Sequence, residues 1–382
     1  MDTRREVMGR EVTIVGGGIA GLALAATLDP RRFDVSLLEG QPGRHASGSA
    51  LGMWPAARKA LRRIGVAEML DDAAPPTPAV GSLYDSAGRE LVAAPGPDLQ
   101  LVERGRLMAA LRAAVPDSVA LETREVVDAA ALPGDLVVGA DGVRSRVRGL
   151  VAPHAVDRVE TPYVALRGIV PAARLGPLDT QPFDTMPSDT QPFDTLPFGE
   201  YWGPGRLFGL VPLAGERCYW FATHRSALGP EPLDVDAVVA EAQAVFADAA
   251  PIARTTLQSA GSAAGTLATR LWVAPPMRRY VHGRYVVMGD AAHASLPNLG
   301  RGACDAILDA VTLGETLNAG GSLLAWQARR LPLTQGARVL AGRVMALALA
   351  ARGQRARDTA LAGVGRLARL AASTHQGPAT AR

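Results

Sequence analysis

Cysteine and long apolar runs are scarce in this sequence, and each scarcity excludes a class of protein. Only Cys218 and Cys304 occur in 382 residues, so the chain has no disulfide framework and no Cys-x-x-Cys metal or redox pair. No apolar run approaches the ~18–20 residues of a membrane-spanning helix. The polar segment at the start lacks the apolar core of a secretory signal. These absences predict a cytoplasmic protein without a metal site.

The sequence also lacks a large excess of positive or negative residues. The formal net charge is +3, Lys59 is the single lysine, and the arginines are scattered along the chain. A nucleic-acid-binding surface needs clustered basic residues, so we expect no nucleic-acid partner. With 48% apolar and 20% charged residues, the composition is that of a globular protein with a sizeable core.

A glycine-rich turn follows the first predicted strand. The segment "VTIVGGGIAG" places Gly16, Gly18 and Gly21 in the spacing G-x-G-x-x-G, between an apolar strand and the helical segment "LALAATL". The first glycine permits a tight turn, the second lets a pyrophosphate approach the backbone, and the third lets helix and strand pack closely. The helix N-terminus then presents unpaired N–H groups to the phosphates. The pattern predicts dinucleotide binding.

An acidic residue ends the second predicted strand, "FDVSLLEG". This residue, Glu39, lies eighteen positions after Gly21. A carboxylate at this place can accept hydrogen bonds from the hydroxyls of an adenosine ribose. The combination strengthens the prediction of a dinucleotide site, but it does not separate NAD from FAD.

Two later segments have the same pattern, in which a predicted buried strand is followed by a turn. In "GDLVVGADGVRSRVR", residues 134–148, a strand leads into Asp141 and Gly142. In "GRYVVMGDAAH" a strand ends at Gly289 and Asp290. The carboxylate on the second turn can hold the hydroxyls of a polyol such as the ribityl chain of a flavin. A helix follows, and its predicted apolar face comprises Ala306, Ile307, Ala310, Leu313 and Leu317.

The three motifs in this order resemble the single-component (group A) FAD-dependent aromatic hydroxylases, the family of para-hydroxybenzoate, salicylate and urate hydroxylases. "VERGRLMAAL" is similar to the segment whose arginine, here Arg104, lies beside the flavin dinucleotide. The resemblance implies that Asp290 binds the ribityl chain and that the helix beginning near Gly302 points at the isoalloxazine. The implied FAD-binding residues are Gly16, Gly18, Ala20, Gly21, Glu39, Arg104, Asp141, Gly142, Gly289, Asp290, Pro297, Gly300, Gly302 and Ala303.

The resemblance also suggests residues near the substrate. Arg167 in "YVALRGIV" and Tyr219 in "GERCYWFAT" lie on predicted strands of a substrate sheet, where each contacts substrate or is an ordinary strand residue. Asn298 stands where urate-hydroxylating relatives carry an aspartate, and an amide cannot transfer protons at neutral pH. His293 more often supports the turn in a "GDAAH" setting than it acts in catalysis.

Other residues keep two interpretations open. The arginines at 144, 146 and 148 contact a phosphate or form a solvated helix face. Arg301 replaces the glutamine that is common in this family. No residue emerges as a catalytic acid or base.

The expected fold is α/β, with a discontinuous Rossmann-like FAD-binding domain and an inserted, mostly antiparallel substrate domain. We expect the FAD domain to comprise residues 1–75, 100–155 and 280–382, with a helical C-terminal part, and the substrate domain to comprise 76–99 and 156–279.

The expected function is that of an NAD(P)H-consuming monooxygenase, in which a flavin C4a-hydroperoxide hydroxylates or epoxidises an aromatic or polyketide-like small molecule in secondary metabolism. FAD is expected to be held without a covalent bond. No second strand–GxGxxG–helix unit occurs, so NAD(P)H is expected to bind transiently. The alternatives are a flavoprotein oxidase or dehydrogenase on the same scaffold and a non-enzymatic flavin-bound sensor. The chain is expected to be a monomer or a homodimer.

A ten-residue tandem, "DTQPFDTMPS" followed by "DTQPFDTLPF", occupies residues 179–198. Two copies are too few for a solenoid, and the regularly spaced prolines break any helix and discourage a central strand. The segment is predicted to be a duplicated loop or a lid over the active site.

Overall fold

The computed structural model describes residues 9–43, 48–70, 80–95, 98–175, 196–229 and 231–375. Contacts divide the chain into two compact units. The first unit comprises Met1–Ala74, Leu101–Thr161 and Leu271–Met345, and the second comprises Pro75–Gln100, Pro162–Arg270 and Ala346–Arg382. None of the described helices is long and apolar enough to cross a membrane. Positions 179–195 of the tandem lie outside the described residues.

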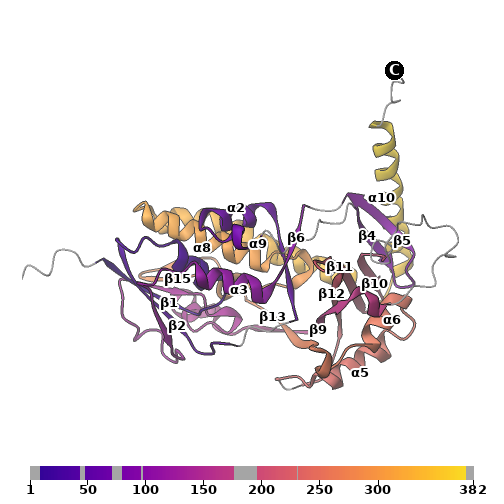
Figure 1. The fold of residues 1–382 in the computed structure, drawn as a ribbon, viewed down its shortest axis with the longest axis horizontal. Coiled ribbons are helices and arrows are strands. Elements are labelled where there is room, and N and C mark those ends of the chain that lie inside the picture. Colours follow the sequence, from indigo (N-terminus) through magenta and orange to yellow (C-terminus); the bar gives the residue numbers. More distant parts are fainter. Residues whose placement is uncertain are drawn as a thin grey trace, which may run out of the picture. The chain divides into compact units, whose positions relative to one another are not determined.

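The first unit is built around a six-stranded sheet with the order β14-β15-β8-β1-β2-β7. Figure 1 labels β1, β2 and β15 of this sheet. Its strands are β1 (Arg10–Val15), β2 (Phe33–Glu39), β7 (Ala120–Thr123), β8 (Leu136–Gly139), β14 (Val281–His282) and β15 (Tyr285–Val287). Adjacent strands are parallel except at the β14–β15 pair. The strand β8 is apolar throughout and the last four residues of β1 are buried, because both faces of a parallel sheet are covered.

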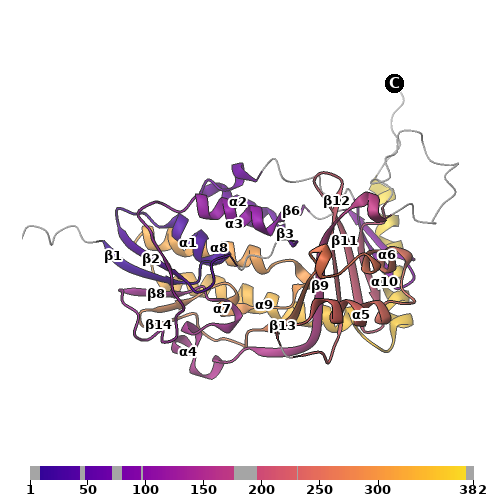
Figure 2. The ribbon, with the colours of Figure 1, turned by 60° about the horizontal axis from the view of Figure 1, so that its bottom comes forward.

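Helices α1 (Ile19–Thr27) and α8 (Gly302–Asn318) pack side by side in this unit (Figure 2). The predicted apolar face of α8 is confirmed, since all five of its residues are buried. The unit also contains α2 (Pro55–Arg63), α3 (Arg104–Ala113), α4 (Val147–Val151), α7 (Asp290–His293), most of α9 (Leu323–Ala348), and a small sheet of β3 (Ala50–Met53) and β6 (Gln100–Glu103).

The second unit contains a seven-stranded sheet with the order β13-β9-β12-β11-β10-β4-β5. The strands are β4 (Val80–Asp85), β5 (Glu90–Pro95), β9 (Val159–Pro171), β10 (Gly199–Gly203), β11 (Arg206–Leu213), β12 (Arg217–Arg225) and β13 (Leu267–Val273). β10 and β4 are parallel, whereas the β4–β5, β10–β11, β11–β12 and β12–β9 pairs are antiparallel. The predicted fold class, a parallel sheet with helices plus a mostly antiparallel sheet, is confirmed.

The two faces of this second sheet differ in burial. Helices α5 (Val235–Val245) and α6 (Pro251–Gln258) share a core with one face, which includes Phe208 and Trp220 (Figure 2). Along β12, Cys218, Trp220 and Ala222 are buried, whereas Tyr219 and Phe221 between them are only half-buried. The period of two therefore gives the sheet one face packed on helices and one partly open face.

The C-terminal helix α10 (Gln354–His375) departs from the prediction that residues 280–382 belong with the FAD domain. It packs on β5 of the second unit, where a Cβ added to Gly365 would lie only 2.4 Å from the carbonyl oxygen of Leu91. An amphipathic pattern indicates that one helix face is buried, but it does not specify the element on which that face packs.

Candidate cofactor site

The three sequence motifs lie at one edge of the parallel sheet. The glycine-rich turn follows β1, the Asp141 turn follows β8, and the Asp290 turn follows β15. These strands are neighbours in the order β15-β8-β1 and run parallel. Their carboxyl ends therefore meet, and this edge is where parallel α/β sheets bind ligands.

The glycine-rich turn combines crowded and open positions. Gly16 has φ +104°, and a Cβ there would lie 2.4 Å from the carbonyl oxygen of Ala140. A Cβ on Gly21 would lie 1.8 Å from the carbonyl oxygen of Gly16, so α1 packs directly on the turn. Gly18, the N-cap of α1, has no described atom within 4 Å of its Cβ position and offers no capping side chain. The N-terminus of α1 therefore has no capping side chain and has open space at Gly18, as an anion site requires.

Glu39 is held in place by two backbone donors. The N–H of Gly17 donates to its Oε2 at 2.7 Å, and the N–H of Gln41 donates to its Oε1 at 2.7 Å. A carboxylate can accept about four hydrogen bonds, so the oxygens retain capacity for ribose hydroxyls.

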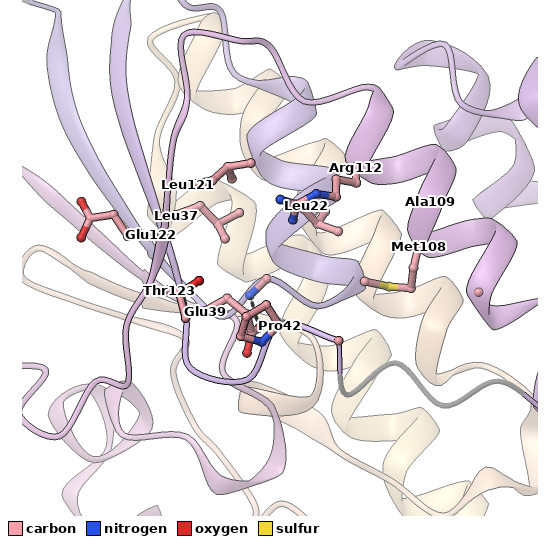
Figure 3. A pocket seen from close by; sticks show the side chains of 13 residues that line it. Leu22, Leu37, Glu39, Pro42, Met108, Ala109, Arg112, Leu121, Glu122 and Thr123 are labelled. Atoms are coloured by element: carbon pink, nitrogen blue, oxygen red, sulfur yellow. Dashed lines mark hydrogen bonds between the residues drawn. The ribbon is translucent and has the colours of Figure 1, made fainter.

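A cavity of about 360 Å³ opens beside Glu39 (Figure 3). Leu37 and Leu121 from the strands line one side, and Met108 and Arg112 from α3 line the other. Arg104, the predicted dinucleotide neighbour, is the first residue of α3 and is half-buried, and its backbone N–H donates to the carbonyl of Ser49. The volume falls in the range of small-molecule sites. Of the lining residues, Gly105, Met108 and Ala109 belong to the segment "VERGRLMAAL" that the family resemblance indicated, whereas Arg112 and those of β7 carry no motif.

The central motif presents a buried carboxylate. Asp141 Oδ2 accepts from the N–H groups of Arg146 at 2.6 Å and Val147 at 3.4 Å. Its Oδ1 is buried and has no hydrogen-bond partner among the described residues. Burial raises the pKa of Asp141. Gly142, at φ +71°, completes the turn in a backbone conformation that favours glycine.

Arg148 corrects the interpretation of the arginine cluster. Unlike the exposed Arg144 and Arg146, it is completely buried. Its guanidinium donates to four backbone carbonyls, those of Val143, Ala155, Val156 and Ala291. It therefore neither contacts a phosphate nor lies on a solvated face. Through Ala291 it joins the central motif to the late one.

The late motif packs on both neighbouring helices. A Cβ added to Gly289, at φ +57°, would lie 3.2 Å from the Cβ atoms of Ala20 and Ala306. Asp290 begins α7 with an exposed side chain. Pro297 begins a short 3₁₀ turn that ends at Gly300, with φ +58°.

Helix α8 begins at Gly302, directly after this turn. No side chain caps its N-terminus, and a Cβ on Gly302 would meet no described atom within 4 Å. Ala303, the next residue, is half-buried. The open end of this 17-residue helix carries the positive end of the helix dipole.

A buried ionic network centred on Asp309 contacts the late turn at Gly289 and His293. Asp309 Oδ2 lies 2.5 Å from His293 Nε2 and accepts the N–H of Gly289 at 3.0 Å, while its Oδ1 accepts from Arg330 Nε at 2.6 Å. Arg330 also contacts Asp305, which pairs with Arg301 at 3.0 Å. His293 thus has the supporting position that its setting suggested. The acidic Asp309 on the buried side of an apolar helix was the signal that could have revealed this network.

The same network determines the pKa directions of its members. Burial alone lowers the pKa of His293, but the Asp309 carboxylate outweighs burial and the net shift is upward. Burial alone raises the pKa of Asp309, but His293 and Arg330 outweigh burial and the net shift is downward. Both directions correspond to a buried pair in its charged form.

The predicted substrate residues belong to two different units, Arg167 and Tyr219 to the second and Asn298 to the first. Arg167 on β9 pairs with Phe221 on β12, so it shares the half-buried sheet face with Phe221 and Tyr219. Its Nη2 donates to Thr269 at 2.6 Å, and its buried Nε has no partner among the described residues. Asn298 lies in the 3₁₀ turn of the first unit, with its Nδ2 3.4 Å from Met345 Sδ and its Oδ1 buried without a described partner.

Comparison with known proteins defines the class. Residues 116–323 match the family model described as FAD binding domain, and residues 11–176 match the one described as FAD dependent oxidoreductase. Aurachin C monooxygenase/isomerase of Stigmatella aurantiaca is 30% identical over 84% of this chain and 84% of its own length. The 3-amino-4-hydroxybenzoate 2-monooxygenase of Streptomyces cremeus is 29% identical over 81% of this chain and 78% of its own.

Solved structures show the same fold. Klebsiella pneumoniae HpxO complexed with FAD and uric acid has a TM-score of 0.76 at 22% identity, covering 95% of both chains. A salicylate hydroxylase substrate complex has a TM-score of 0.75 at 21% identity, covering 98% of this chain and 99% of the other. Fold and motifs together define a flavoprotein oxidoreductase. The chain belongs to the FAD-dependent monooxygenases of the aromatic hydroxylase family, the group A flavin monooxygenases, and FAD is the cofactor of that family.

The residues present fit this cofactor. The open space at Gly18 would be filled by any Cβ, as expected where a pyrophosphate approaches the backbone. The orphaned oxygen of Asp141 needs a donor, and a ribose or ribityl hydroxyl is a donor. The cavity beside Glu39 has room for an adenosine.

Proposed function

We propose that the protein is an NAD(P)H-consuming monooxygenase that hydroxylates or epoxidises an aromatic or polyketide-like small molecule in secondary metabolism. The observation that carries the proposal is the meeting of three cofactor motifs at one sheet edge. The names of similar proteins support it, since one is an aurachin C monooxygenase/isomerase and another is a monooxygenase of an aminohydroxybenzoate, an aromatic small molecule.

In this proposal the first unit holds FAD through the residues of the three motifs. The turn that holds the pyrophosphate would comprise Gly16, Gly18, Ala20 and Gly21. The carboxylate of Glu39 would accept hydrogen bonds from the hydroxyls of the adenosine ribose. Arg104, Asp141 and Gly142 would line the middle of the cofactor. Gly289 and Asp290 would hold the ribityl chain. Pro297, Gly300, Gly302 and Ala303 would bring the backbone close to the isoalloxazine, where the N-terminus of α8 favours negative charge.

The bound flavin supplies the redox chemistry and the transfer of one oxygen atom from O₂. The chain has to bind, orient and keep water out. NAD(P)H would bind transiently, because the sequence contains no second strand–GxGxxG–helix unit.

The half-buried face of the second sheet is the proposed substrate surface. The rings of Tyr219 and Phe221 are tilted by 38° with centroids 5.9 Å apart, and Arg167 lies in register beside Phe221. An aromatic surface with one cation suits a planar, electron-rich substrate. Asn298 can orient a ligand by hydrogen bonds but cannot exchange protons with it. We therefore assign no catalytic acid or base to these residues.

Oxygen labelling tests the proposed reaction. With a substrate identified from a panel of phenols, quinones and polyketides, the enzyme should consume NAD(P)H and O₂ together. One atom from ¹⁸O₂ should appear in the product. An unlabelled product with hydrogen peroxide equal to the NAD(P)H consumed would instead establish an oxidase. The absence of any substrate-stimulated NAD(P)H consumption across the panel would favour a flavin-bound sensor.

A further inference from the structure

The indole N–H of Trp54 is a buried donor without an acceptor. Trp54 follows β3 and is the N-cap residue of α2, and its ring is half-buried. The Nε1 atom itself is buried and has no hydrogen-bond partner among the described residues. Buried polar groups in folded proteins are almost always paired, because leaving one unpaired costs about 1–3 kcal/mol. An unpaired donor of this kind indicates a partner that the chain itself does not supply.

Other tryptophans of the chain show how an indole is normally accommodated. Trp326 is completely buried, and its Nε1 donates to Thr312 Oγ1 at 3.2 Å. Trp202 donates from Nε1 to Glu200 Oε2 at 2.9 Å. The unpaired indole of Trp54 is thus not a general feature of this fold.

The position of Trp54 indicates which partner is missing. Its Nε1 lies 4.0 Å from the place that a Cβ on Gly300 would take. Its backbone N–H donates to Cys304 Sγ at 3.4 Å, and that thiol donates to the carbonyl of Gly52 at 3.0 Å. Cys304 therefore fastens the segment before α2 to the first turn of α8. The unpaired donor lies at the glycine turn that we assign to the isoalloxazine.

We propose that the Trp54 indole N–H donates a hydrogen bond to an acceptor atom on the isoalloxazine ring of bound FAD. The carbonyl oxygens and ring nitrogens of that ring are hydrogen-bond acceptors. A donor that is buried beforehand loses no further hydration when it meets one of them. This proposal rests on FAD binding by the late motif and not on the monooxygenase reaction.

The proposal gives Trp54 a signature that a purely structural tryptophan lacks. In the chain without FAD the unpaired N–H costs free energy, so its removal should remove that cost. In the FAD complex the same removal should lose a hydrogen bond. Trp54→Phe should therefore weaken FAD binding while destabilising the FAD-free chain little.

The test compares Trp54→Phe with Trp326→Phe, which makes the same change where the indole already has a partner. FAD affinity is measured by titrating the full-length apoprotein, and stability by thermal unfolding with and without FAD. The dissociation constant of FAD should rise roughly three- to tenfold in Trp54→Phe, as the loss of one neutral hydrogen bond predicts, and should stay within twofold in Trp326→Phe. The FAD-free chain should lose more thermal stability in Trp326→Phe. The visible absorption band of the bound flavin should shift only in Trp54→Phe.

Two results would overturn the proposal. One is an FAD affinity and flavin spectrum of Trp54→Phe that equal those of the unaltered protein. The other is a loss of stability in FAD-free Trp54→Phe as large as in Trp326→Phe, including failure to fold. FAD binding is measured without turnover, so an enzyme that failed the ¹⁸O₂ test would still give a valid result here.

Discussion

His293 Nε2 lies 2.5 Å from Asp309 Oδ2, and the two side chains are only 4% and 0% exposed. The same carboxylate accepts from Arg330 and from the backbone N–H of Gly289. A single buried anion thus fixes two cations and the turn that precedes Asp290. Such an arrangement is sensitive to the loss of any one member, because the remaining charges stay buried without compensation.

Asp309→Asn should destabilise the protein by about 3–5 kcal/mol, the usual cost of removing one partner from a buried ion pair. An amide cannot neutralise His293 and Arg330 together. Urea unfolding of the full chain measures the change in the free energy of unfolding. Asp34→Asn is the control, because Asp34 is exposed and its replacement should change that free energy by less than about 0.5 kcal/mol. Equal stability of the two variants would show that the network does not stabilise the fold.

The pKa of His293 predicts how stability depends on pH. Its folded-state value is raised, so its contribution is fully present below the ordinary pKa of about 6.5 and disappears as pH rises through the higher folded-state value. The charged groups around it are Asp309, Asp290, Asp305 and Arg330. The free energy of unfolding should therefore fall above about pH 6.5, by at most about 1.4 kcal/mol per pH unit.

The lowered pKa of Asp309 predicts that the free energy of unfolding also falls at acid pH. Its contribution to stability is present above its ordinary pKa of about 3.9 and disappears as pH falls through the lower folded-state value.

The variant His293→Gln tests the alkaline part of this prediction. In it, the free energy of unfolding should fall less steeply above about pH 6.5. An unchanged alkaline slope in that variant would assign the titration to another group.

Gly18 and Gly21 should respond differently to alanine. A Cβ on Gly18 meets no described atom, whereas one on Gly21 would lie 1.8 Å from a backbone oxygen. Gly18→Ala should keep the thermal stability of the FAD-free chain but weaken FAD binding at least about tenfold, because the methyl group occupies the phosphate approach. Gly21→Ala should destabilise the FAD-free chain itself. Tight FAD binding by Gly18→Ala would place the pyrophosphate elsewhere.

Asp290→Ala should yield mostly FAD-free protein, because it removes the carboxylate that we assign to the ribityl chain. Asn298→Ala, in the following turn, should keep its flavin. The flavin released by acid from each purified protein measures occupancy, and full release would also confirm non-covalent binding. Full occupancy in both variants would remove Asp290 from the cofactor site.

Two glycines of α10 test the packing of the C-terminal helix. A Cβ on Gly365 would lie 2.4 Å from the backbone oxygen of Leu91, whereas one on Gly363 meets no described atom. Gly363→Ala should stabilise the chain by about 0.5–1 kcal/mol through helix propensity. Gly365→Ala should destabilise it, because the backbone of β5 has to move. Stabilisation in both variants would show that α10 does not rest on β5.

Sequence patterns alone predicted the local elements of the site. Strand, turn and helix around Gly16, the turn at Asp141, and the buried face of α8 at Ile307 all follow from patterns within about ten neighbouring residues, and the physics of apolar periodicity and glycine turns is local. The parallel sheet followed from strands that alternate with helices, and the inserted, mostly antiparallel domain followed from the family resemblance.

Which groups meet across long separations in the chain depends on how the elements pack in three dimensions. The strand order places the turns at Gly16, Asp141 and Gly289 side by side, and no local pattern specifies that order. Arg148 is buried because carbonyls as far away as Ala291 accept from it, 143 positions along the chain. The unpaired indole of Trp54 and its neighbour Gly300 likewise come together only in the fold. The cost of burying a polar group, and the partners available to it, depend on all the groups that surround it. The burial of Arg148 and the unpaired indole of Trp54 therefore arise only when the chain is packed.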